Sequence, residues 1–384
     1  MLFPIVGYFI WTGDPRLFSL GSISIKWNAV LLILGFLICR QILFYIFSQE
    51  KKPLNEASKL SIYLVLSALI SSRLGYLIFY EPKSLWQKAL TIVFPFEFEP
   101  AFNILSPDEF SVHGAVIGIL VFLFLYKRKN RLHQNYLQVL DRVTIPAAVS
   151  GIFLLASSFL HSDTIGKQTS SSSGTVFIQP VVNGLLKVPC CIMRSPDGLN
   201  PLERVIVKKD SPASKSNMRH QPVILYLFFK PGPSEQLVNE FLVGDVKTYL
   251  YDMSRFVLEP GTQPLQYRIF LDTNGQYIAR VKTLGIVRYP VQIFEAVTLL
   301  ILAGFLFWWF VKFKTRLQPG RLFGIFMLVY WTARFLFQYL KESDSASLAG
   351  VGIQISSFLN ILFMVIGLIA LIISLRKIPA VLAR

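Results

Sequence analysis

The chain has 384 residues, of which 53% are hydrophobic and only 16% are charged. Ordinary soluble domains carry about 25% charged residues, so this composition excludes a typical soluble protein. The net charge is +16, but the basic residues lie in clusters between long apolar runs. That pattern favours a membrane protein and argues against a partner that is nucleic acid. The three cysteines lack the spacing of metal ligands, so no metal site is expected.

Seven apolar segments are long enough to cross a bilayer, which takes about 20 residues of helix. Gly114 and Gly118, in the third segment, suit close packing of helices. Residues 85–110 contain several prolines and are expected to form an interfacial or re-entrant segment. The sequence therefore predicts an all-α polytopic membrane protein of about seven transmembrane helices. The expected helices are 27–47, 59–80, 112–126, 137–160, 291–311, 322–340 and 351–375.

Basic residues are concentrated in alternate loops between these segments. Because positively charged loops stay in the cytoplasm, the N-terminus is expected outside and the C-terminus in the cytoplasm. The residues that set this orientation are Lys51, Lys52, Lys127, Arg128, Lys129, Arg131, Lys312, Lys314, Arg316, Arg321, Arg376, Lys377 and Arg384.

A polar stretch of the chain, 161–288, separates the fourth apolar segment from the fifth. It is predicted to form a small, inserted α+β head on the extracytoplasmic side. Transmembrane helices one to four then occupy 1–160, and helices five to seven occupy 289–384. Within the head we expect a strand at 223–230, a helix at 233–257, and a hairpin with strands at 267–271 and 276–282 around an Asp-Thr-Asn-Gly turn.

Four ionisable residues lie within the apolar segments: Arg73, His113, Glu295 and Arg334. Such groups are costly in a bilayer and are usually functional or paired. With a rise of about 1.5 Å per residue, all four fall in the outer half of the membrane. Two guanidinium groups at one depth would suit a phosphate, which arginine binds through two parallel hydrogen bonds.

Two amides are expected to line the same polar cavity. Gln338 lies one turn after Arg334, and Gln292 lies three residues before Glu295. Plainer interpretations stay open. Arg334 and Glu295 could form a structural ion pair. Arg73 could extend to the interface, and His113 could be an ordinary interfacial histidine.

Several short motifs, in the same order, resemble the prolipoprotein diacylglyceryl transferase family. They cover both ends of the chain but not the head. The matching segments are Asp14-Pro15-Arg16-Leu17-Phe18, Ile25-Lys26-Trp27, Leu34-Gly35-Phe36, Ser72-Arg73-Leu74-Gly75-Tyr76, Phe79-Tyr80, His113-Gly114-Ala115, Asp141 with Pro146, Tyr289-Pro290-Val291-Gln292-Ile293-Phe294-Glu295, Gly320-Arg321-Leu322-Phe323-Gly324 and Ala333-Arg334-Phe335.

This resemblance implies a reaction in which a diacylglyceryl group moves from phosphatidylglycerol to the lipobox cysteine of a prolipoprotein signal peptide. Glycerol phosphate leaves, and neither a metal nor another cofactor is needed. The setting it implies is the bacterial cytoplasmic (inner) membrane. Carried over by position, His113, Arg334 and Glu295 would be catalytic. The substrate-binding residues would be Arg73, Gln292, Gln338, Gly114, His161, Asp163 and Gly166.

The chain departs from the family signature that follows the fourth helix. Leu155 stands where the family has arginine, and Ser157 and Ser158 replace a glycine and an asparagine. Losing one donor of that kind can cost about 3 kcal/mol of transition-state stabilisation. Two hypotheses therefore remain: an active transferase, or a catalytically impaired paralogue that binds lipid, lipopeptide or a protein partner through its enlarged head. A transporter is disfavoured, because no inverted repeat is evident.

Overall fold

The computed structural model divides the chain into two compact units. One consists of Phe18–Phe159 with Val291–Arg384, and the other of Met1–Leu17 with Leu160–Pro290. Cys190 and Cys191 lie outside the described residues. The structure describes residues 9–13, 16–20, 23–93, 96–97, 103–104, 109–129, 135–171, 173–188, 200–210, 219–314, 317–342 and 355–376.

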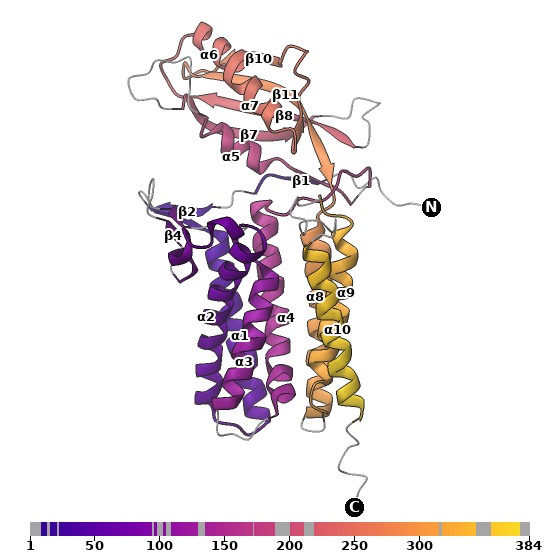
Figure 1. The fold of residues 1–384 in the computed structure, drawn as a ribbon. Helices are drawn as coiled ribbons and strands as arrows, with labels where there is room; N and C mark the ends of the chain where they lie inside the picture. The colour runs from indigo at the N-terminus through magenta and orange to yellow at the C-terminus, as the bar shows by residue number, and fades with distance from the viewer. Residues whose placement is uncertain are drawn as a thin grey trace, which may run out of the picture. The chain divides into compact units, whose positions relative to one another are not determined.

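Each of the seven apolar segments forms a helix (Figure 1). Five of them, α1, α2, α4, α8 and α10, are long and apolar enough to cross a membrane. The chain is therefore a polytopic membrane protein. Many exposed side chains on these helices are apolar, and Ile301 on α8 is 68% exposed. The seven helices are α1 (Trp27–Gln49), α2 (Leu54–Phe79), α3 (Val112–Lys129), α4 (Tyr136–His161), α8 (Val291–Phe313), α9 (Arg321–Gln338) and α10 (Ile355–Arg376).

Helices α3 and α9 are shorter, with 18 residues each. Helix α3 ends in the basic run Lys127, Arg128 and Lys129, and α9 contains Arg321 and Arg334. These charges lower the apolar character of both helices, so their length and composition alone do not mark them as membrane spans.

The carboxylate of Asp141 on α4 holds the start of α9. Its two oxygens accept hydrogen bonds from the backbone N–H groups of Gly320, at 2.6 Å, and Phe323, at 2.8 Å. The first N–H groups of a helix have no partner within the helix, and the helix dipole favours an anion there. Gly320 has a φ of 90°, a conformation that suits glycine. Asp141 thus fixes where α9 begins and joins it to α4.

The connection between α2 and α3 contains two short 3₁₀ helices and a two-stranded ribbon. The 3₁₀ helices are Pro82–Ser84 and Ala89–Ile92, and the ribbon pairs β4 (Phe96–Glu97) with β5 (Asn103–Ile104). This is where the sequence predicts an interfacial segment. Trp86 and Leu90 are largely exposed there, as expected for side chains that meet lipid.

The second unit is built on a seven-stranded sheet in which β1, β6, β11, β8 and β7 follow one another, and β9 and β10 also pair with β11. Strand β1, which the sequence analysis groups with the transmembrane helices, pairs in parallel with β6. A separate ribbon pairs β2 (Arg16–Leu20) with β3 (Ile23–Lys26). The strands of the sheet are β1 (Phe9–Trp11), β6 (Thr175–Phe177), β7 (Leu202–Lys209), β8 (His220–Phe229), β9 (Val257–Leu258), β10 (Gln266–Leu271) and β11 (Tyr277–Arg288).

The elements predicted for the head are largely confirmed. Strand β8 covers the first predicted strand, and β10 and β11 form the predicted hairpin. Gly275 adopts a φ of 72° in its turn. The predicted helix is present as three consecutive helical pieces: α6 (Glu235–Phe241), a π-helical turn (Leu242–Val246) and α7 (Lys247–Asp252).

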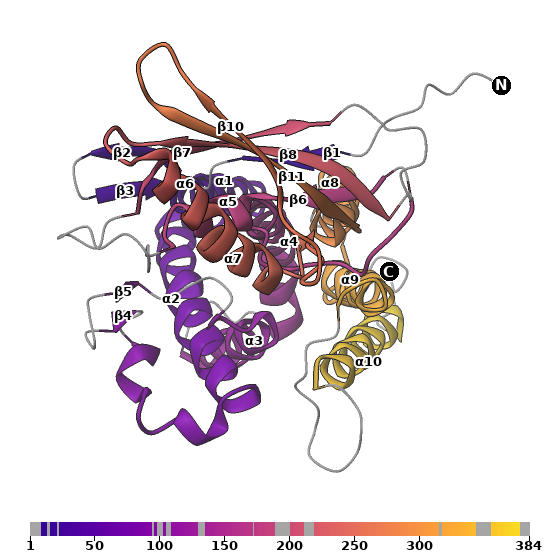
Figure 2. The same cartoon turned by 90° about the horizontal axis from the view of Figure 1, so that it is seen from above.

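One face of this sheet forms the core of the unit. Leu225 and Leu227 on β8 and Val281 on β11 are fully buried in an apolar cluster that includes residues of α5 (Gln179–Leu185), α6 and α7. Alternate residues of a strand point to opposite faces, so the residues between them lie on the other face. Strands β10, β11, β8 and β7 follow one another in Figure 1, and Figure 2 shows α6 and α7 on one side of these strands.

Candidate functional site

A carboxylate shared by two cations lies within the helical unit. Glu295 on α8 has a side chain that is only 1% exposed. One of its oxygens lies 3.3 Å from Nη1 of Arg334 on α9, and the other lies 2.6 Å from Nζ of Lys341. Arg334 also donates a hydrogen bond to the hydroxyl of Tyr330 at 3.2 Å. With two cations and one anion, this group carries a net positive charge that suits an anionic ligand.

A chain of hydrogen-bonded side chains links α3, α10 and α9. Nε2 of His113 lies 3.0 Å from Oδ1 of Asn360, and Nδ2 of Asn360 donates to Oε1 of Gln338 at 3.0 Å. Gln338 in turn donates to the hydroxyls of Ser356 and Ser357, both at 2.8 Å. Because Gln338 lies one turn after Arg334, this chain extends from the histidine to the helix that carries the shared ion pair.

The contact with Asn360 sets the chemical state of His113. An amide oxygen only accepts hydrogen bonds, so Nε2 of His113 carries the proton in this contact and Nδ1 is the nitrogen left to accept one. The imidazole is packed against the rings of Trp331 and Phe363, whose centroids lie 5.3 and 6.2 Å away. These contacts hold the imidazole in one orientation.

The structure brings together four of the residues that the sequence analysis singles out: His113, Glu295, Arg334 and Gln338. Gln292 is buried on α8, three residues before Glu295. The expected ion pair between Arg334 and Glu295 is present, and a second cation joins it.

Sequence reasoning missed two members of this group. Asn360 is an amide within an apolar helix and is 2% exposed. A search for all polar residues in the apolar segments, and not only the ionisable ones, would have found it. Lys341 follows the apolar segment that contains Arg334, and no sequence pattern shows that its side chain contacts Glu295.

Gly114, beside His113, serves close packing of α3 against α2. A Cβ atom on Gly114 would lie 2.6 Å from the carbonyl oxygen of Ser71 and 2.7 Å from Cα of Gly75. A Cβ on Gly118, one turn later, would collide with the side chain of Ser71. The predicted close packing at Gly114 and Gly118 is therefore confirmed.

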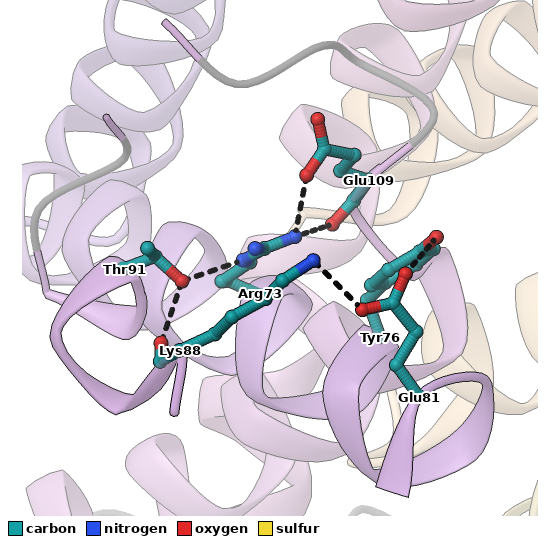
Figure 3. Close-up of polar contacts among 6 residues, drawn as sticks. All are labelled: Arg73, Tyr76, Glu81, Lys88, Thr91 and Glu109. Atoms are coloured by element: carbon teal, nitrogen blue, oxygen red, sulfur yellow. Dashed lines mark hydrogen bonds and ion pairs between the residues drawn. The ribbon is translucent and has the colours of Figure 1, made fainter. Parts of the chain in front are cut away.

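Arg73 belongs to a different cluster of polar contacts. Its side chain is buried in the C-terminal part of α2. Its Nε donates to Thr91 at 3.1 Å, and its Nη1 donates to the carbonyl, at 3.2 Å, and the carboxylate, at 3.0 Å, of Glu109 (Figure 3). From the sequence, Arg73 is predicted to line one cavity with Arg334, and this stays a prediction. Its hydrogen bonds join α2 to two segments within the α2–α3 connection.

A second ion pair supports this cluster. Lys88 donates to the carboxylate of Glu81 at 3.0 Å, and the hydroxyl of Tyr76 donates to the same carboxylate at 3.4 Å (Figure 3). The hydrogen bond from Lys88 holds the pKa of Glu81 below its usual value. The backbone carbonyl of Lys88 also accepts a hydrogen bond from the hydroxyl of Thr91 at 2.7 Å. This bond connects the Arg73–Glu109 ion pair to the Lys88–Glu81 ion pair.

Replacing Arg73 with alanine should therefore loosen the α2–α3 connection and lower the free energy of unfolding by about 2 kcal/mol, because Glu109 and Thr91 lose a charged partner. Thermal unfolding of the detergent-solubilised protein measures this. The matched control is Lys88→Ala, which removes a more exposed cation and should cost no more than about 0.5 kcal/mol. Equal effects of the two substitutions would contradict this interpretation.

The sequence model of the family described as prolipoprotein diacylglyceryl transferase matches residues 15–373. The chain belongs to this family. A phosphatidylglycerol–prolipoprotein diacylglyceryl transferase of Tolumonas auensis is 22% identical over 367 residues, which are 96% of this chain and 98% of that protein. The transferase of the same name from Bdellovibrio bacteriovorus is 23% identical and covers 94% and 93% of the two chains. That of Chloroherpeton thalassium is 32% identical over 44% of this chain and 59% of its own length.

Three further candidate residues of this diacylglyceryl transferase family member, His161, Asp163 and Gly166, lie in the sheet-containing unit. The carbonyl of Gly166 accepts a hydrogen bond from Arg288 at 2.9 Å. A Cβ on Gly166 would lie 2.2 Å from the carbonyl oxygen of Tyr289, so only glycine fits there. A substrate-binding role for these three residues stays a prediction.

Proposed function

We propose that this protein transfers the diacylglyceryl group of phosphatidylglycerol to the lipobox cysteine of prolipoproteins. The observation that carries the proposal is the buried cationic group in which Arg334 and Lys341 share Glu295. Relatives that align over nearly their whole length are named for this activity. Both observations favour an active transferase over an impaired paralogue.

We further propose that all seven helices span the bacterial inner membrane, with the N-terminus outside and the C-terminus in the cytoplasm. The basic loops support this orientation. In this arrangement, helices one to four occupy 1–160, the head occupies 161–288 on the outer side, and helices five to seven occupy 289–384. Glu295, near the start of α8, then lies in the outer half of the membrane.

In the proposed reaction, Arg334 and Lys341 bind the phosphate of the lipid. Glu295 holds both cations in position before the lipid arrives. His113 takes the proton from the cysteine thiol through Nδ1, while Asn360 keeps Nε2 protonated. The thiolate sulfur attacks the glyceryl carbon that carries the phosphate. The carbon–sulfur bond forms as the carbon–oxygen bond breaks, and glycerol phosphate leaves with the bonding electrons, stabilised by the cations.

Lys341 also bears on the altered family signature. The arginine that the family carries at the position of Leu155 is absent here, so this chain lacks one cation of the usual set. Lys341 provides a second cation beside Arg334, at 2.6 Å from Glu295. We infer that Lys341 supplies the positive charge that the signature arginine supplies in other members.

Replacing His113 with alanine should reduce transfer about a hundredfold, because the thiol then loses its proton acceptor. The assay measures transfer of labelled diacylglyceryl from phosphatidylglycerol vesicles to a lipobox peptide. His220→Ala, a histidine of the sheet-containing unit, is the matched control and should leave the rate unchanged. If the unmodified protein shows no turnover above the His113→Ala variant, the proposed function is wrong.

A further inference from the structure

The sheet of the second unit has a face opposite its core that combines aromatic and basic side chains. Val207, Leu225 and Val281 pair across β7, β8 and β11 and belong to the core. The residues one position away in each strand point to the other face, which we call the open face. Among the described residues, no helix of the apolar cluster packs on the open face.

The strand register defines three rows of side chains on the open face, each of which crosses β10, β11, β8 and β7. The first row is Phe270, Ile278, Phe228 and Arg204. The second row is Arg268, Arg280, Tyr226 and Ile206, and the third is Gln266, Lys282, Ile224 and Lys208.

A hollow of about 310 Å³ lies in the middle of the open face. Phe270 is 46% exposed and Ile206 is 37% exposed, so the apolar lining of the hollow forms part of an exposed apolar patch. The side chains that line the hollow are Ile206, Lys208, Tyr226, Phe228, Phe270 and Ile278.

Cations surround the hollow and already lie against its aromatic rings. The guanidinium of Arg204 lies 4.2 Å from the ring centroid of Phe228, and Nζ of Lys208 lies 5.4 Å from that of Tyr226. The rows hold five basic residues and no acidic one. One carboxylate, that of Asp210, pairs with two of the five, at 3.8 Å from Arg280 and 3.5 Å from Lys282. The charge of the open face therefore matches an anionic partner.

We propose that the open face binds an acidic polypeptide segment with an apolar side chain that fills the hollow. The inference rests on the proposed function, because transfer to a prolipoprotein requires the enzyme to hold a protein acceptor whose chain continues beyond the reacting cysteine. The segment bound here is that continuation. Acidic side chains pair with Arg204 and Lys208, and an aromatic or aliphatic side chain packs on Phe228 and Phe270.

The shape of the open face favours a peptide over a lipid surface. Proteins that lie on a bilayer insert protruding apolar side chains between the headgroups. Here the apolar side chains line a hollow, which instead receives a side chain from the partner.

The test uses the full-length protein in detergent and a fluorescein-labelled twelve-residue peptide of alternating acidic and leucine or phenylalanine residues. Fluorescence anisotropy should show binding, and Arg204→Glu/Lys208→Glu should weaken it roughly tenfold. The control Lys187→Glu/Lys247→Glu reverses two charges at the helices on the opposite side and should leave affinity unchanged. A peptide with lysine in place of its acidic residues should bind the unmodified protein more weakly and the reversed variant more tightly.

Equal affinity of the unmodified protein and the Arg204→Glu/Lys208→Glu variant would overturn the proposal. So would displacement of the peptide by phosphatidylglycerol vesicles but not by the unlabelled peptide, since that result identifies a lipid surface as the partner. Phe270→Ser is a second variant, at an exposed position. It should also weaken binding of the peptide, and it introduces no new charge.

A kinetic measurement separates this proposal from the proposed function. The charge-reversed variant should raise KM for an acceptor with an acidic extension after the cysteine. It should leave kcat/KM unchanged for a peptide that ends just after the cysteine. Unchanged KM for the long acceptor would refute the binding role of the open face. Absence of transfer to either acceptor by the unmodified protein would refute the proposed function, while the anisotropy result would still stand.

Discussion

An Arg334→Ala variant should transfer diacylglyceryl about a thousandfold more slowly than the unmodified protein. Arg334 donates to both Glu295 and Tyr330, so its guanidinium is already oriented before any lipid binds. In the proposed reaction, its removal takes away the donor that meets the charge developing on the departing phosphate. Lys341 stays paired with Glu295, and its single ammonium group lacks the planar arrangement of donors that a guanidinium provides.

Steady-state transfer kinetics in detergent–lipid micelles measure this effect. Arg334→Lys is the matched variant, which keeps the charge but cannot form two parallel hydrogen bonds. Its transfer rate should therefore fall between those of the unmodified protein and the Arg334→Ala variant. If Arg334 were only a structural partner of Glu295, Arg334→Ala would lower the melting temperature and leave kcat of the folded fraction unchanged. That outcome would assign the cluster to stability alone.

The second large effect is expected at Asp141. Replacing it with alanine should lower the free energy of unfolding by about 3 kcal/mol, because two backbone N–H groups at the start of α9 lose the carboxylate that accepts their hydrogen bonds and the helix dipole loses its counter-charge. Chemical or thermal denaturation in micelles, followed by circular dichroism, gives the value.

Asp141→Asn is the matched control for this prediction. The amide keeps one oxygen that can accept from either Gly320 or Phe323, but it carries no charge. Its stability should therefore lie about midway between those of the unmodified protein and the alanine variant. If both variants unfold like the unmodified protein, the carboxylate does not hold the start of α9.

The positions of the helices were predictable from the sequence because long apolar runs leave little alternative to a helix. Helix α2 begins at Leu54, five residues before its expected start at 59. The expected start is late because the first turns of the helix contain the polar residues Asn55, Glu56 and Lys59. A search for apolar residues does not detect a polar end of a helix. Strand β7 was missed for a similar reason, since Leu202–Lys209 mixes basic and apolar residues. Strand β1 was missed because its partner β6 lies far along the chain.

The sequence predicts those members of the candidate site that are ionisable residues within apolar helices. His113, Glu295 and Arg334 can be picked out because a charged or ionisable side chain is costly in a bilayer. Their partners could not be predicted, because pairing depends on which helices pack together. Arg73 illustrates this limit. Its expected depth matches that of Arg334, but its partner Glu109 comes from an irregular connection whose course no pattern predicts.

The contact between α2 and α3 also constrains how the protein can move. At Gly75 and Gly114 the two backbones touch with no side chain between them. Side chains can change rotamer to absorb a small displacement, but a backbone contact has no such freedom. His113 moves with α3, on which it lies, and Arg73 moves with α2. The imidazole and the α2–α3 connection are therefore mechanically coupled. A motion that admits a lipid must move these two helices together as one rigid body. The conformational change needed for substrate entry must then occur at other helix contacts.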